Sequence, residues 1–130
     1  MNCIIVTQDS LVEESIRKLI LESADLYLIS AFHTFDKASA CMTDYCIDIL
    51  FFDIQMYDFD SIEFIHTIPE STFVIFIPQP DLFVNINSTV TEKSSNLMMK
   101  CFREGIDEAR SFLSLSTTEK RNRSTDYFII

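Results

Sequence analysis

The chain of 130 residues is poor in the residues that interrupt regular structure, with 1 glycine and 3 prolines. Tight turns that need positive φ must therefore fall to Asn, Asp or Ser. Tryptophan is absent, but 12 phenylalanines contribute to a hydrophobic fraction of 48%, which is ample for a packed core and argues against disorder. The length favours a single domain.

Basic residues are also scarce, because 10 Lys and Arg stand against 20 Asp and Glu, giving a formal net charge of −10. Such a field repels phosphate backbones, so we expect DNA contact only through a separate basic domain. No apolar run approaches the roughly 20 residues of a membrane span, and the N-terminus lacks the basic start of a signal peptide. We therefore expect a cytoplasmic protein without membrane contact.

The four cysteines, Cys3, Cys41, Cys46 and Cys101, show no CxxC spacing, and we expect reduced, mostly buried thiols. Cys41 and Cys46 with His33 lack a second close pair, which argues against a metal cluster. The sequence also contains no Gly-rich phosphate loop, nucleophile elbow or His-based metal motif. These observations indicate that the chain is not an enzyme.

Strand and helix patterns alternate along the chain. Two local signals mark helix starts: Ser10 with Glu13 as a capping box, and Asp36 as a second cap. Apolar runs predict strands at 3–6, 26–32, 47–52 and 72–77, and apolar residues at helical spacing predict helices at 11–22, through 38–42, at 61–68 and at 97–113.

This alternation implies βαβ crossovers and a parallel sheet with both faces covered. We predict a three-layer α/β fold with a doubly wound five-stranded parallel sheet in the order 2-1-3-4-5. The region from 81 to 96, between strands 4 and 5, is expected to be shortened or irregular. Such a fold binds ligands at the carboxyl ends of strands 1 and 3. Asp53 directly follows strand 3, and Thr7, Gln8 and Asp9 follow strand 1.

Several segments resemble the receiver domain of two-component response regulators, and are closest to receivers that precede a LytTR-type DNA-binding domain. The similarity covers most of residues 1–78, is weak from 79 to 96 and is moderate over 102–113. It implies a flavodoxin-like fold, a phosphoryl-accepting Asp53, Mg²⁺ as cofactor and a sensor histidine kinase as partner. The segments that carry it are MNCIIV at 1–6, DILFFDIQM at 48–56, IEFI at 62–65 and FVIF at 73–76.

The receiver family places two acids after strand 1, because Mg²⁺ must offset the charge of a carboxylate attacking a phosphoryl group. The corresponding positions hold Thr7 and Gln8, which are degenerate. Asp9, one place later, and Asp53 remain as weak metal candidates. Asp9 is equally well explained as a loop residue beside Ser10.

Two further family positions also differ. Where a hydroxyl is expected at the end of strand 4, the chain has Ile77 and Pro78. Lys93 is the candidate for the phosphoryl-contacting lysine after strand 5, although Ser follows it in place of Pro. Asp58 and Asp60 are expected to be solvated loop acids or a cap for the helix at 61.

The favoured interpretation is a degenerate pseudo-receiver that controls a transcriptional output domain through protein contact and homodimerises. One alternative is a conventional Mg²⁺-dependent receiver that switches through phosphorylation of Asp53. A second is a stand-alone adaptor or a small ligand-binding α/β domain.

The C-terminal part differs in character from the rest. We expect a receiver-like domain over 1–115 and, over 116–130, a polar linker that leads into the apolar DYFII, the possible first strand of an output domain. The alternative is a tail that docks on its own sheet edge or on a second subunit.

Overall fold

The computed structural model describes residues 1–56, 58–77, 92–115 and 127–129, with backbone only for 59, 92–101 and 127–129. Helices and strands alternate as the sequence predicts. In chain order the elements are β1 (Asn2–Val6), α1 (Ser10–Leu21), β2 (Tyr27–Phe32), α2 (Phe35–Asp44), β3 (Ile49–Asp53), the 3₁₀ turn η1 (Ile54–Met56), α3 (Phe59–Thr67), β4 (Phe73–Ile77), α5 (Glu92–Leu113) and β5 (Tyr127–Ile129).

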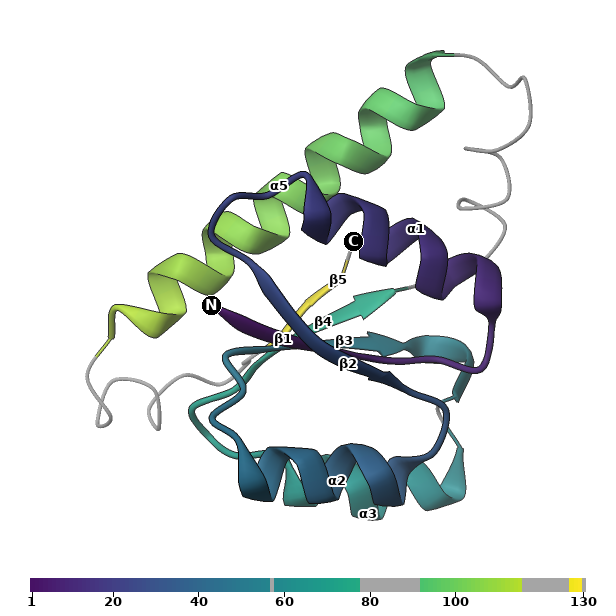
Figure 1. Ribbon diagram of the computed structural model, residues 1–130, viewed down its shortest axis with the longest axis vertical. Coiled ribbons are helices and arrows are strands. Elements are labelled where there is room, and N and C mark those ends of the chain that lie inside the picture. Colours follow the sequence, from purple (N-terminus) through teal and green to yellow (C-terminus); the bar gives the residue numbers. More distant parts are fainter. Residues whose placement is uncertain (57, 78–91, 116–126, 130) are drawn as a thin grey trace.

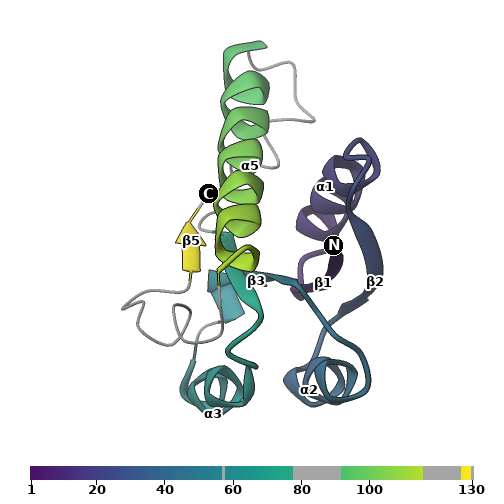
Figure 2. The same cartoon turned by 90° about the vertical axis from the view of Figure 1, so that its left-hand side faces the viewer.

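The strands form one parallel sheet in the order β2-β1-β3-β4-β5. Helices α1 and α5 cover one face, and α2 and α3 cover the other, so the molecule has three layers (Figures 1 and 2). The predicted parallel α/β fold and the order 2-1-3-4 of the first four strands are confirmed. The doubly wound order places the carboxyl ends of β1 and β3 side by side.

The place beside β4 is taken by the C-terminal strand β5, whose Tyr127 pairs with Val74. The sequence predicted a fifth strand without fixing its bounds and a shortened or irregular region over 81–96; of that region, 81–91 lie outside the described residues and 92–96 belong to α5. A tail docked on its own sheet edge was the alternative for the C-terminal segment. The boundary at 115 stays a prediction, because 116–126 lie outside the described residues.

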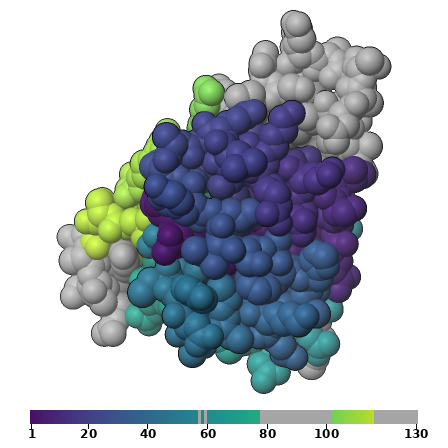
Figure 3. Space-filling model, viewed as in Figure 1, coloured from purple at the N-terminus to yellow at the C-terminus, as the bar shows by residue number. Residues whose placement is uncertain are grey.

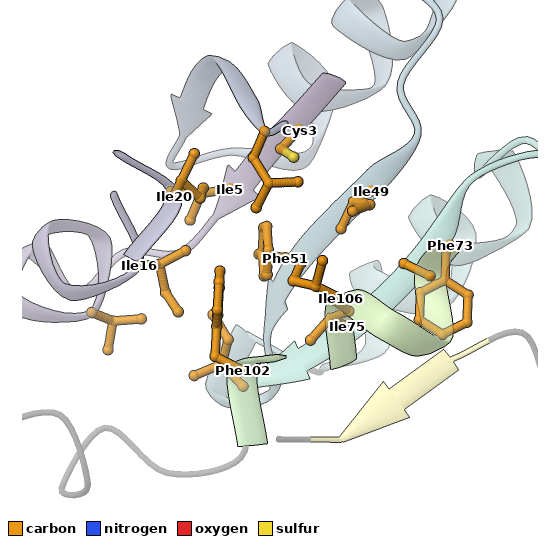
Figure 4. Close-up of a cluster of buried hydrophobic side chains, with 14 of the residues drawn as sticks. Cys3, Ile5, Ile16, Ile20, Ile49, Phe51, Phe73, Ile75, Phe102 and Ile106 are labelled. Atoms are coloured by element: carbon orange, nitrogen blue, oxygen red, sulfur yellow. The ribbon is translucent and has the colours of Figure 1, made fainter. Parts of the chain in front are cut away.

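One half of the core lies between the sheet and the pair α1 and α5 (Figure 4). The predicted stripe on α1 is buried, since Val12, Ile16 and Ile20 recur every fourth residue. Phe51 of β3 stacks on Phe102 of α5 with ring centroids 5.6 Å apart. Fully burying one such side chain contributes about 1.5–3 kcal/mol.

The other half of the core lies beneath α2 and α3, because successive strand residues point to opposite faces. Leu50 and Phe52 of β3 pack there with Met42 of α2. Phe35 stacks on Phe64 with ring centroids 4.9 Å apart, which joins α2 to α3. A strand buried on both faces must be apolar throughout, which explains the run ILFF before Asp53.

Two expected helix caps are wrong. Asp9, and not Ser10, caps α1: its side chain accepts from the N–H groups of Leu11 and Val12, and Ser10 is already helical. Helix α2 follows Thr34 without a side-chain cap bond, and Asp36 lies in its first turn.

Two helices begin earlier than expected. Helix α3 starts at Phe59 instead of residue 61, because Asp58 and Ser61 form a reciprocal capping box. Of the two readings for Asp58, the helix cap is therefore the one observed. Helix α5 starts at Glu92 instead of residue 97. The residues before Leu97 are mostly polar and show no apolar periodicity, so no sequence pattern marked this earlier start. Among the described residues, no helix is long and apolar enough to cross a membrane.

Candidate functional site

The carboxylate of Asp53 is held at the carboxyl end of the central strand β3. Asp53 is the last residue of β3 and pairs with Ile77 of β4, while the preceding Phe52 pairs with Val6 of β1. Its side chain is 2% exposed. Strand β3 therefore places a carboxylate at the carboxyl end of the sheet, where the sequence predicts the ligand site, but this carboxylate is buried beneath the surface.

Both carboxylate oxygens of Asp53 accept hydrogen bonds from neutral groups. The hydroxyl of Thr7, which is fully buried, donates to Oδ2 at 2.7 Å, and the N–H of Gln55 donates to Oδ1 at 2.9 Å. Among the described residues Asp53 forms no ion pair. Hydrogen bonds to a charged group contribute about 1.5–3 kcal/mol each, so these two donors offset much of the cost of burying the charge.

The direction of the Thr7 hydroxyl is fixed by its second partner. The N–H of Asp9 donates to Thr7 Oγ1 at 3.1 Å. Because that oxygen accepts from Asp9, its own hydrogen is directed at Asp53. Thr7 is in turn fixed at its backbone, where its N–H donates to Phe32 O of β2 at 3.1 Å. Thr7 is thus part of the site. The sequence comparison had treated it only as a position where an expected acid is missing.

Asp9 is occupied by the helix that it caps. Its Oδ1 accepts from Leu11 N at 2.9 Å and from Val12 N at 3.4 Å. An extended backbone, with φ −95° and ψ 116°, sets this geometry. Of the two readings of Asp9, the loop residue beside the start of α1 is the one that these contacts describe.

Gln8 is exposed, and its side chain contacts the backbone at the end of β2. Its amide lies 3.5 Å from His33 O, a long contact at the end of β2. His33 itself lies 3.1 Å from Glu13 of α1, which also pairs with Arg17 at 3.6 Å. These polar side chains form a surface network beside the site.

The two remaining candidates are not brought to Asp53 by described contacts. Pro78 lies outside the described residues. Lys93 is the second residue of α5, so its expected position at the end of a strand is wrong. Its phosphoryl-contacting role stays a prediction.

The described residues do not fit a formed Mg²⁺ site. Mg²⁺ prefers six oxygen ligands, with one or two carboxylates directly bound. Each oxygen of Asp53 accepts one hydrogen bond from a neutral donor, and Oδ1 of Asp9 caps α1. Over the part of the chain that the structure describes, no group of three or more His, Cys, Asp or Glu could hold a metal ion.

Three exposed apolar side chains surround this end of the sheet. Leu11 is the second residue of α1, Ile54 directly follows Asp53, and Ile62 lies in the first turns of α3. All three come from segments that follow or adjoin the carboxyl ends of β1 and β3. Sequence reasoning missed them, although an apolar residue next to a predicted polar rim was the available signal.

One depression, of about 430 Å³, lies between α2 and α3, and its lining includes Thr34, Asp36 and Glu63. A second, of about 240 Å³, lies between α3 and β4 beside Pro69 and Phe76. Neither depression includes Asp53 or Thr7 in its lining, so the buried carboxylate does not open into them.

The chain matches no known family model and no curated protein. Among solved structures it is similar to the RcsB response regulator of Salmonella typhimurium, described for its conformational dynamism in DNA interaction. The TM-score is 0.54 at 16% identity, over 93% of this chain and 74% of RcsB. At this identity the likeness shows a shared fold, which agrees with the parallel α/β sheet described above.

Proposed function

We propose that this chain is a degenerate receiver-like signalling module that acts through protein contact and not through phosphorylation. The hydrogen bond from Thr7 Oγ1 to Asp53 Oδ2 carries the proposal. An oxygen that attacks a phosphoryl group must be accessible and must have a cation nearby to offset charge. Here that oxygen is buried against a hydroxyl, and the nearest acid of the β1 loop caps a helix.

The contact surface of the proposed module lies around Asp53. Exposed Leu11, Ile54 and Ile62 offer apolar area at the end of the sheet where response regulators carry their site. Apolar side chains gathered at a functional rim are typical of protein interfaces. A sensor histidine kinase, or a protein that takes its place, is the proposed partner at this surface.

The proposed output is transcription, through a LytTR-type DNA-binding domain. The likeness to a response regulator supports this proposal, and the net charge of −10, which disfavours DNA contact by this chain itself, is compatible with a separate DNA-binding module. The setting is cytoplasmic, and the chain itself catalyses no reaction. Reading the gene past Ile130 discriminates the versions: a basic β-rich domain supports a regulator, and a stop codon supports a stand-alone adaptor.

Phosphoryl transfer is tested directly by incubating the chain with Mg²⁺ and acetyl phosphate and measuring its intact mass. We expect no gain of a phosphoryl group, and an unrelated active receiver in the same buffer serves as the positive control. A stoichiometric gain that disappears in Asp53→Asn would overturn the degenerate reading.

The second candidate is a conventional Mg²⁺-dependent receiver that switches through Asp53. It is favoured by one observation: the acid itself is retained at the end of β3. In this version the Thr7 hydroxyl must rotate away before Asp53 reacts. The same mass measurement decides between the two candidates, because only the conventional receiver gains mass.

A further inference from the structure

The two oxygens of the Asp53 carboxylate are bonded to two different surface segments. Oδ2 accepts from the hydroxyl of Thr7, whose oxygen accepts from the N–H of Asp9, the residue that caps α1. Oδ1 accepts from the N–H of Gln55, two residues further along the chain. One buried acid is therefore joined, through three hydrogen bonds, to the start of α1 and to the turn η1.

Each of these two segments carries an exposed apolar side chain. Leu11 directly follows the cap: its N–H donates to Oδ1 of Asp9 at 2.9 Å, and it is 40% exposed. Ile54 lies between Asp53 and Gln55, so the hydrogen bond that closes this turn fixes its backbone, and it is 36% exposed. Figure 3 shows the start of α1, in purple, at the right-hand surface of the molecule.

The third exposed apolar side chain at this end of the sheet is held by other contacts. Ile62 belongs to α3 and follows Ser61, which forms a reciprocal capping box with Asp58. Ser61 N donates to Asp58 Oδ1, and Asp58 N donates to Ser61 Oγ, both at 2.9 Å. The contacts that place Ile62 therefore do not include Asp53, and this part of the surface serves as an internal reference.

The hydrogen bonds at Asp53 require a carboxylate. A carboxylate has two acceptor oxygens, whereas an amide of the same shape has one acceptor and one donor group. Both neighbours of Asp53 are donors: the Thr7 hydrogen is directed at it because Asp9 N donates to the hydroxyl oxygen, and the N–H of Gln55 can only donate. Two converging donors explain an acid at this place without any phosphoryl chemistry.

We propose that Asp53 is a positioning residue, which holds Leu11 and Ile54 in place on the surface through Thr7 on one side and the N–H of Gln55 on the other. The description of Leu11 and Ile54 as partner-contacting residues rests on the proposed function, whereas the positioning itself does not. The acid thereby has a role in this chain that does not depend on its accepting a phosphoryl group.

Amide hydrogen exchange, measured by NMR on the 130-residue chain, tests the proposal because each branch contains a reporter. These surface amides exchange through local openings, so a change in global stability alone does not accelerate them. Asp53→Ala removes both acceptors, and the amides of Asp9 and Gln55 should exchange about tenfold faster or more. The Ser61 amide is the reference and should stay within about threefold of its rate in the natural sequence.

Two further variants separate the branches. Thr7→Val should accelerate exchange at Asp9 and leave Gln55 within about threefold of its rate in the natural sequence. Thr7→Ser should restore slow exchange at Asp9, because it returns the hydroxyl. Asp58→Ala is the matched control, since it removes a helix cap at the same end of the sheet, and it should leave both branches unchanged.

Methyl resonances show whether the side chains themselves change their surroundings. Those of Leu11 and Ile54 should shift in Asp53→Ala, and those of Leu11 alone should shift in Thr7→Val. The methyl resonances of Ile62 should stay in place in both variants.

Several results would overturn the proposal: unchanged exchange or unchanged methyl resonances in Asp53→Ala, equal acceleration at Ser61, or a Thr7→Val variant that affects both branches alike. If Asp53→Ala does not fold, Thr7→Val and Thr7→Ser decide alone. A phosphoryl gain with acetyl phosphate would instead overturn the proposed function and leave these expectations as they are, so the two failures are distinguishable.

Discussion

The Thr7 hydroxyl lies 2.7 Å from Asp53 Oδ2, although the two residues are 46 positions apart in sequence. The pair joins the ends of β1 and β3, and the N–H of Asp9 fixes its direction. A hydroxyl at this place does two things that a carboxylate cannot do. It donates to Asp53, and it adds no negative charge to a buried anion.

Removing the donor should destabilise the fold. Thr7→Val keeps the shape of the side chain but leaves Oδ2 of buried Asp53 without its hydroxyl partner. We expect a loss of about 1–3 kcal/mol in the free energy of unfolding, measured by urea denaturation at pH 7. Thr7→Ser should restore most of it. The exposed Thr43→Val serves as a control and should change stability by less than about 0.5 kcal/mol.

Acids in place of Thr7 and Gln8 should create a response to Mg²⁺. The double variant Thr7→Asp, Gln8→Asp brings carboxylates beside Asp53, and their repulsion should lower Tm without metal. Millimolar Mg²⁺ should raise Tm of the variant by several degrees and leave the natural sequence unchanged. Equal responses of both proteins in calorimetry would contradict this account of the site.

The ion pair between Asp25 and Arg110 should contribute stability that depends on pH. The Arg110 guanidinium, which donates to both oxygens of Asp25, lowers the pKa of that carboxyl below its usual value. A lowered folded-state pKa means that the stabilisation is full above the unfolded value, about 3.9, and is lost as pH falls through the folded value. Both side chains are about half exposed, so solvent screening limits the gain to about 1 kcal/mol or less.

The measurement compares Asp25→Asn with the natural sequence in urea from pH 7 down to pH 2. The difference in free energy of unfolding should be present at pH 7 and should close below about pH 3.9. Asp44→Asn is the control, because Asp44 forms no ion pair among the described residues. A difference in free energy of unfolding that widens on acidification would show that the predicted direction of the pH dependence is wrong.

Two neighbouring acids should differ sharply in their effect on α3. Asp58 caps the helix: its Oδ1 accepts from Ser61 N at 2.9 Å. Asp58→Ala should therefore cost about 1 kcal/mol in chemical denaturation. Asp60→Ala removes a second exposed acid, which forms no cap bond, and should stay within about 0.5 kcal/mol of the natural sequence. Equal effects would indicate that net charge, and not capping, governs this helix.

Thiol labelling should separate Cys46 from Cys3. Burial raises the pKa of the Cys3 thiol to about 12, so almost no thiolate forms at neutral pH. Cys46 is exposed and should react with iodoacetamide in the native protein. Peptide mapping should find Cys3 labelled only after denaturant is added. Labelling of both at similar rates would show that β1 opens readily.

The parts of the fold that depend on local patterns could be predicted from the sequence. Unbroken apolar runs identified four strands, and the fourfold spacing of Val12, Ile16 and Ile20 identified α1. Helix caps were harder, since Asp9 and Ser10 are adjacent and both can cap. Which of the two caps the helix depends on where β1 ends and the chain turns into α1, and no local sequence pattern contains that information.

Long-range relationships could not be predicted in the same way. The contact between Thr7 and Asp53 depends on the register of two strands, and sequence reasoning compared Thr7 only with an expected acid. Strand β5 is a similar case: YFI reads as a strand, but its place beside β4 requires knowledge of the whole sheet. A residue that differs from the functional residue of a similar family, such as Thr7, can therefore form a different contact in the folded protein.

Helix α5 has a mechanical consequence because it is much longer than the strands that it covers. Its 22 residues span about 33 Å, whereas a strand of five residues spans about 17 Å. Its C-terminal half is anchored by Phe102, Ile106 and Phe112 in the core, and its N-terminal half extends past the sheet (Figure 2). Such a helix is a lever arm. A slight tilt at the anchored half, where Phe102 stacks on Phe51, becomes a larger displacement at Glu92.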